Sequence, residues 1–129
     1  MNLLLDTHTF IWTFREPNKL SSAAVDAISD ANNTSFISVV TIWEMQIKTA
    51  LGKMDLGDTL RNIVIEQIAN GFNILDFNLD HALAVESLPV NPKHKDPFDR
   101  LLISQAMVED MTIITIDEHF ADYTVKVLW

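Results

Sequence analysis

Two acidic residues at the start of a predicted helix could take part in metal chemistry. The segment Asp96-Pro97-Phe98-Asp99 predicts a helix start, because proline suits the first helical position and Asp96 can accept hydrogen bonds from the free amides. Asp99 precedes Leu102 and Ile103 by three and four residues, which places its carboxylate on the apolar, inward face of that helix. A charge on that face is costly unless it has a partner. Alternatively, the two acids only cap the helix and favour its dipole.

Asp6 and Asp117 occupy equivalent positions at the ends of apolar segments. Residues 2–5 and 111–116 are apolar runs of the kind that form parallel strands buried on both faces. In an open parallel sheet the ligand crevice lies outside the carboxyl ends of the strands, so both aspartates are expected there. Either residue could instead cap the helix that follows it.

Glu44 is a further acid in a predicted helix over residues 39–51, which begins after Ser38 and ends at Gly52. It borders the apolar stripe that should face the core, and the helix starts from the same edge of the sheet as the two aspartates. Glu44 could alternatively form an intrahelical ion pair with Lys48, four residues later.

Predicted helices and strands alternate along the whole chain. This alternation implies a three-layer α/β/α sandwich with a central, mainly parallel sheet, formed by a single domain over residues 1–129. The other strands are expected at residues 35–37, 72–75 and 125–128, and the other helices after Asp6, after Ser21 or Ser22, from Gly57-Asp58, and after Asn78 or Asp80.

Composition narrows the range of functions. The 129 residues carry a formal net charge of -9, which argues against a broad basic surface for nucleic acid, so phosphate must be met locally. The absence of cysteine excludes a zinc-thiolate site and a disulfide framework. No signal peptide or membrane-spanning run is visible, and a soluble, cytoplasmic protein is therefore expected.

A few basic residues and histidines lie near the acids. Lys93, Lys95 and Arg100 lie close to the 96–99 segment and could bind a phosphate substrate, or they could belong to a solvated turn. His81 is expected on the surface of a short helix.

Four carboxylates at one edge of a sheet require neutralisation. Two like charges ~4 Å apart repel by about 4 kcal/mol at an effective dielectric near 20, which is large beside a total folding stability of ~5 to 15 kcal/mol. With only oxygen ligands, Mg²⁺ or Mn²⁺ fits better than zinc. One or two such ions can bring a water to attack a phosphodiester and stabilise the leaving oxygen.

The same residues resemble the motifs of PIN domains, and most closely those of VapC-type toxins of toxin-antitoxin pairs. The matching segments are Leu4 to His8, Ser38 with Trp43-Glu44, Asp96 to Ile103, and Thr115 to Asp117. The resemblance implies a Mg²⁺- or Mn²⁺-dependent endoribonuclease that cuts transfer or other structured RNA and inhibits translation. It also implies a homodimer, silenced by a cognate antitoxin whose C-terminal segment occupies the acidic groove.

The resemblance also assigns roles to residues. The acidic quartet corresponds to Asp6, Glu44, Asp99 and Asp117. Thr7 and Thr115 are expected to orient Asp6 and Asp117 through their hydroxyls. Asp96 either caps its helix or contacts water on the metal, and Glu118 or His119 is the candidate for a further ligand.

Other functions compete with this interpretation. The chain could be a catalytically silent binding module whose acids receive a basic partner segment. A receiver domain with a phosphorylatable aspartate is disfavoured, because Thr7 and His8 follow Asp6 where a paired acid is expected. A haloacid-dehalogenase-like phosphatase would need an aspartate at position 8.

Overall fold

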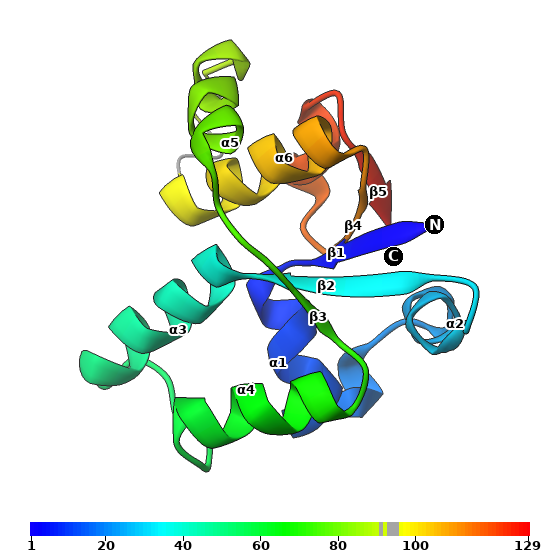
Figure 1. Ribbon diagram of the computed structural model, residues 1–129, viewed down its shortest axis with the longest axis vertical. Helices are drawn as coiled ribbons and strands as arrows, with labels where there is room; N and C mark the ends of the chain where they lie inside the picture. Colours follow the sequence, from blue (N-terminus) through cyan, green and yellow to red (C-terminus); the bar gives the residue numbers. More distant parts are fainter. Residues whose placement is uncertain (91, 93–95) are drawn as a thin grey trace.

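A five-stranded parallel sheet forms the centre of the structure, a computed structural model that describes residues 1–90, 92 and 96–129 (Figure 1). The strands lie side by side in the order β3-β2-β1-β4-β5, and every neighbouring pair is parallel. Their bounds are β1 Asn2–Leu5, β2 Thr34–Ser38, β3 Asn73–Leu75, β4 Thr112–Ile114 and β5 Lys126–Leu128.

The strand β1 lies in the middle of the sheet and is buried on both faces. Leu3 and Leu5 point to one face and Leu4 points to the other, since side chains alternate along a strand. All three leucines are fully buried. An apolar run without alternation is typical of a parallel strand covered by helices on both sides, as predicted for residues 2–5.

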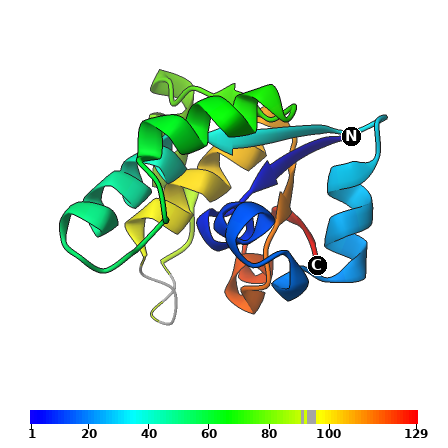
Figure 2. The same ribbon diagram turned by 90° about the horizontal axis from the view of Figure 1, so that it is seen from below.

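Helices cover both faces of the sheet (Figure 1 and Figure 2). One core joins Leu4 to α6, whereas the other joins Leu3 and Leu5 to α1, α2, α3 and α4. These two cores confirm the α/β/α sandwich. The helices are α1 Thr7–Arg15, α2 Ser22–Ser29, α3 Val39–Ala50, α4 Leu60–Ala69, α5 Leu79–Ala84 and α6 Pro97–Glu109, with short 3₁₀ turns η1 Pro17–Lys19, η2 Val85–Ser87 and η3 Glu118–Asp122. None of the helices in the described ranges has the length and apolar character needed to cross a membrane.

Most helix starts lie where the sequence predicts them. Five of the predicted caps accept backbone hydrogen bonds: Asp6, Ser21, Ser38, Asn78 and Asp96. The helix α4 starts later than predicted, because Thr59 and not Gly57-Asp58 provides its cap. The strand β4 is shorter than the predicted 111–116, and Ile116 beyond its end is 55% exposed.

His81 is fully buried, so its predicted place on a helix surface is wrong. Its Nδ1 accepts a hydrogen bond from the Asn78 amide at 3.1 Å, and its Nε2 lies 2.9 Å from Glu109 Oε1. The Asn78 side chain in turn accepts from the His81 amide at 3.1 Å, which completes a capping box. His81 therefore joins the start of α5 to the end of α6.

Replacing His81 with alanine is expected to lower the free energy of unfolding by about 2 to 4 kcal/mol, because it leaves a cavity and removes the acceptor of the Asn78 amide. Leu79→Ala on the same helix is the control, since Leu79 is 70% exposed. Urea denaturation measures both. Equal effects of the two substitutions would contradict a structural role for His81.

Candidate active site

A cavity of about 360 Å³ lies at the carboxyl edge of the sheet and is rich in acids. All four members of the predicted quartet line it, together with the cap of α6. Its lining residues are Asp6, Thr7, His8, Trp12, Glu44, Asp96, Asp99, Ile116 and Asp117. Five carboxylates from distant parts of the sequence therefore share one cavity.

Strand order explains why the cavity lies at this place. The connections run outward in one direction from β1 to β2 and β3, and in the other direction to β4 and β5, so the topology reverses between β1 and β4. Ligands bind in the crevice at such a switch point. Asp6 follows β1 and Asp117 follows the extension of β4, so the two aspartates flank the crevice.

Asp6 is held rigidly and is almost completely buried. Its Oδ1 accepts a hydrogen bond from the Thr9 amide at 2.8 Å, and its Oδ2 accepts one from the Thr115 hydroxyl at 2.6 Å. Burial raises the pKa of the Asp6 carboxyl above its usual 3.8, although these hydrogen bonds act in the opposite direction. The site thus contains a carboxylate whose negative charge is not fully compensated.

Glu44 is also buried, and both of its carboxylate oxygens have partners. Oε1 accepts a hydrogen bond from the Thr7 hydroxyl at 2.7 Å, and Oε2 pairs with the Lys48 ammonium. The predicted intrahelical pair is therefore present, and it coexists with a position at the cavity wall. The ion pair with Lys48 and the place of Glu44 at the cavity wall, predicted as alternatives, are therefore compatible.

The Thr115 hydroxyl contacts Asp6 and Asp117, the two residues it was expected to orient, whereas the Thr7 hydroxyl binds a different acid. Thr7 contacts Glu44 and not Asp6, because it lies in the first turn of α1 with its side chain toward α3. The Thr115 hydroxyl donates to Asp6 and accepts from the Asp117 amide at 3.0 Å, but it does not bind the Asp117 carboxylate. Each hydroxyl still orients an acid that lines the cavity.

Helix caps supply part of the cavity wall. Asp96 Oδ1 accepts from the amides of Phe98 at 2.8 Å and Asp99 at 3.3 Å, and Asp117 Oδ1 accepts from the His119 amide at 2.9 Å. Both residues also line the cavity. Capping and a place in the site are compatible, since each carboxylate has a second oxygen.

Of the predicted basic contacts, only Arg100 lies within the described residues. Its guanidinium donates to the Pro89 carbonyl at 2.8 Å and lies 3.3 Å from the Tyr123 hydroxyl. Arg100 does not line the cavity, so these contacts favour a role in holding the loop before α6. Lys93 and Lys95 are outside the described residues.

Two cavity residues were missed as site candidates, and the two candidates for a further metal ligand do not line the cavity. His8 and Trp12 line it from α1, and the available signal was their spacing of four residues from the first turn of that helix, directly after Asp6. Glu118 and His119 do not line it, and His119 Nδ1 instead lies 3.6 Å from Asp122 Oδ2.

The donor chemistry of the cavity fits a hard divalent cation. Carboxylate oxygens dominate the wall, and partly uncompensated negative charge at Asp6 would be relieved by a cation. Within the described part of the chain, no group of three or more acidic or histidine side chains is arranged to hold a metal ion. Mg²⁺ does not require such a cage, because it keeps several waters and binds through one or two carboxylates.

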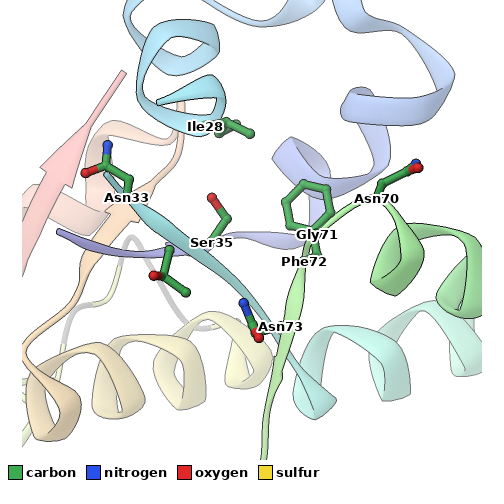
Figure 3. Close-up of a pocket in the computed structure, with 8 residues that line it drawn as sticks. Ile28, Asn33, Ser35, Asn70, Gly71, Phe72 and Asn73 are labelled. Atoms are coloured by element: carbon green, nitrogen blue, oxygen red, sulfur yellow. The ribbon is translucent and has the colours of Figure 1, made fainter. Parts of the chain in front are cut away.

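A second cavity, of about 270 Å³, lies at the opposite end of the sheet (Figure 3). Asn33, Asn70 and Asn73 lie around it, and Ile28 and Phe72 supply apolar surface. No charged side chain is among its described lining residues, so it lacks the groups for metal or acid-base chemistry.

Comparison with known proteins identifies the fold family. The model of the PIN domain family matches residues 3–126. This chain belongs to the PIN domain family. The strand order of this PIN domain also excludes a receiver domain, whose order is 2-1-3-4-5.

Solved structures similar to this PIN domain include VapBC and FitAcB structures. VapBC2 from Rickettsia felis, bound to a DNA fragment from its promoter, aligns with a TM-score of 0.75 at 17% identity, over 99% of this chain and 98% of that chain. VapBC-1 from nontypeable Haemophilus influenzae aligns with a TM-score of 0.65 at 19% identity, over 99% of this chain and 97% of that chain. FitAcB from Neisseria gonorrhoeae aligns with a TM-score of 0.63 at 21% identity, over 98% of this chain and 96% of that chain. The comparison with curated proteins found no match.

The raised pKa of Asp6 predicts a pH-dependent effect of Asp6→Asn on stability without metal. The folded state binds the Asp6 proton more tightly than the unfolded state, so ionisation of Asp6 costs stability as pH rises from about 3.8 through the folded pKa. Asparagine still caps α1 but carries no charge. The free energy of unfolding of the variant relative to the parent should rise over this interval and then level off.

Urea denaturation in EDTA at a series of pH values measures this difference. Asp26→Asn on the exposed side of α2 is the control for removing one negative charge. A relative stability of Asp6→Asn that falls as pH rises would contradict the assigned environment of Asp6.

Proposed function

We propose that this chain is the toxin of a toxin-antitoxin pair: a VapC-type, divalent-metal-dependent endoribonuclease with its PIN domain over residues 1–129. The observation that carries the proposal is the cavity lined by five carboxylates at the switch point of the sheet. Membership of the PIN domain family and structural likeness to VapBC complexes support it.

Each acid has a role in this proposal. Asp6 and Asp99 would hold a Mg²⁺ or Mn²⁺ ion, and Glu44 and Asp117 would complete or orient its water shell. Such an ion, when bound, makes a water reactive toward phosphorus and stabilises charge on the phosphodiester. Thr115 keeps Asp6 oriented, and Thr7 keeps Glu44 oriented, through hydrogen bonds of 2.6 Å and 2.7 Å.

The substrate class is taken from the likeness to VapC-type toxins, and the charge of the chain limits how such a substrate could bind. A protein with a net charge of -9 repels a long polyanion, so binding must depend on the cation site and a few local contacts. A structured RNA such as a transfer RNA can present one strained or exposed phosphodiester to such a site, and its cleavage would inhibit translation. Lys93 and Lys95 remain the predicted contacts to the RNA backbone.

A cognate antitoxin and a homodimer belong to the same proposal. The Rickettsia and Haemophilus neighbours are VapBC assemblies, which supports an antitoxin partner for this chain. The acidic cavity is electrostatically complementary to a basic peptide segment, which could enter it and prevent access of RNA. Both partners would act in the cytoplasm.

A second candidate is a catalytically silent binding module that retains the acidic cavity. The pairing of Glu44 with Lys48 favours it, because an acid already held by an ammonium is less available to a metal ion. The two candidates differ in metal-dependent cleavage, which a single experiment measures.

Asp99→Asn is expected to lower RNA cleavage at least about a hundredfold, because the cation loses a charged oxygen ligand. Thermal stability in metal-free buffer should stay equal or increase, since crowding of like charges is relieved. The purified chain, freed of any partner, is incubated with total cellular RNA and Mg²⁺ or Mn²⁺, and the new RNA ends are mapped.

The controls separate the site from general effects. EDTA should abolish the cuts, and Asp110→Asn should leave them unchanged, since exposed Asp110 lies at the far end of α6. Asparagine also tolerates the left-handed conformation of that residue. Cleavage by Asp99→Asn at the parent rate would refute the assigned site, and a folded protein without cleavage would favour the binding module.

A further inference from the structure

Lys48 brings a positive charge to Glu44, a carboxylate that lines the acidic cavity, although Lys48 itself is not among the lining residues. It lies one helical turn after Glu44 on α3, and its ammonium pairs with the Glu44 carboxylate. The Lys48 side chain is only 30% exposed, whereas the Glu44 side chain is 3% exposed. A lysine that gives up much of its hydration to reach a buried carboxylate needs a compensating interaction.

The compensation extends beyond Glu44 to the acids of α6. Helices α3 and α6 are packed together, with the rings of Trp43 and Phe98 5.7 Å apart in an edge-to-face contact. Glu44 lines the same cavity as Asp96 and Asp99, so an ammonium bonded to Glu44 acts on the same group of carboxylates. Burial alone would lower the pKa of Lys48, but the bond to Glu44 and the charges of the two aspartates outweigh it and raise that pKa.

We propose that Lys48 is the resident counter-ion of the acidic cavity. In the metal-free protein its ammonium offsets the mutual repulsion of the carboxylates and holds Glu44 in place. A divalent cation that enters the cavity must then compete with this ammonium, so Lys48 weakens metal binding. This second part rests on the proposed metal site, whereas the first part does not.

The proposal makes Lys48 a positioning residue and differs from a simple helix pair. An intrahelical Glu44–Lys48 pair alone would contribute a few tenths of a kcal/mol and would be independent of Asp99. A counter-ion of the whole cavity couples energetically to Asp99, which lies on another helix. Energetic coupling therefore distinguishes the two roles.

A double-mutant cycle between Lys48→Met and Asp99→Asn in EDTA tests the first part. Methionine keeps the length and helix propensity of lysine but removes its charge. We expect Lys48→Met to lower the melting temperature, and Asp99→Asn to raise it more in the Lys48→Met background than in the parent. Lys48→Arg keeps the charge, so its melting temperature should remain close to that of the parent. This variant also provides a test if Lys48→Met does not fold.

The matched control is Lys126→Met, because Lys126 also pairs with an aspartate, Asp110, but on the exposed surface. Its cycle with Asp99→Asn should show additive effects. Additive effects in the Lys48 cycle as well would overturn the counter-ion role.

Titration of the melting temperature with Mn²⁺ tests the second part without any activity measurement. The apparent Mn²⁺ affinity of Lys48→Met should exceed that of the parent by roughly tenfold, because a nearby positive charge is lost. Lys126→Met should match the parent. A Mn²⁺ affinity of Lys48→Met equal to or weaker than that of the parent would contradict competition between Lys48 and the metal ion. A parent that does not respond to Mn²⁺ would refute the proposed metal site, whereas the EDTA cycle would still decide the counter-ion role.

Discussion

Repulsion among the carboxylates of one cavity, two of them buried and three half-buried, is the constraint on which this structure depends. Two such charges ~4 Å apart cost about 4 kcal/mol at an effective dielectric near 20, and five carboxylates share one cavity. A domain with a total stability of ~5 to 15 kcal/mol tolerates this only if the charges are offset. Threonine hydroxyls, backbone amides at helix starts and the Lys48 ammonium supply local compensation.

The apolar core keeps the acids together despite their repulsion. Leu3, Leu4 and Leu5 anchor β1 between two cores, and Ile113 and Ile114 do the same for β4 beside it. The residues after these strands have little freedom to move apart, because the ladder fixes the strand ends. The packing of the sheet thus stabilises an arrangement of like charges that is unfavourable by itself. Such a local conflict with the rules of folding is expected at a functional site.

Local features of the fold could be predicted from sequence, but lateral and long-range contacts could not. Caps such as Asp6 and Ser38 carry their signal in a few neighbouring residues, and β1 carries it in its unbroken apolar run. The order of the strands in the sheet cannot be predicted from hydrophobic periodicity, because a buried parallel strand has the same sequence pattern at any place in the sheet. The meeting of α3 and α6 at the cavity depends on that order.

The partners of polar side chains show the same limit. Thr7 binds Glu44 across 37 residues, and Thr115 binds Asp6 across 109 residues, so neither contact has a local sequence signal. Arg100 contacts the Pro89 carbonyl for a similar reason. That Asp6, Glu44, Asp99 and Asp117 share one cavity was predictable, because each acid lies in an apolar context where a charge is unexpected.

The central claim is that this cavity is a divalent-cation site. Anomalous diffraction from crystals of the parent chain soaked in Mn²⁺ tests it most directly, with crystals of Asp99→Asn treated alike. We expect an anomalous manganese peak between Asp6 and Asp99 in the parent, and we expect this peak to be lost in Asp99→Asn. A parent crystal with an accessible cavity and no peak there, or a peak that persists unchanged in Asp99→Asn, would contradict it.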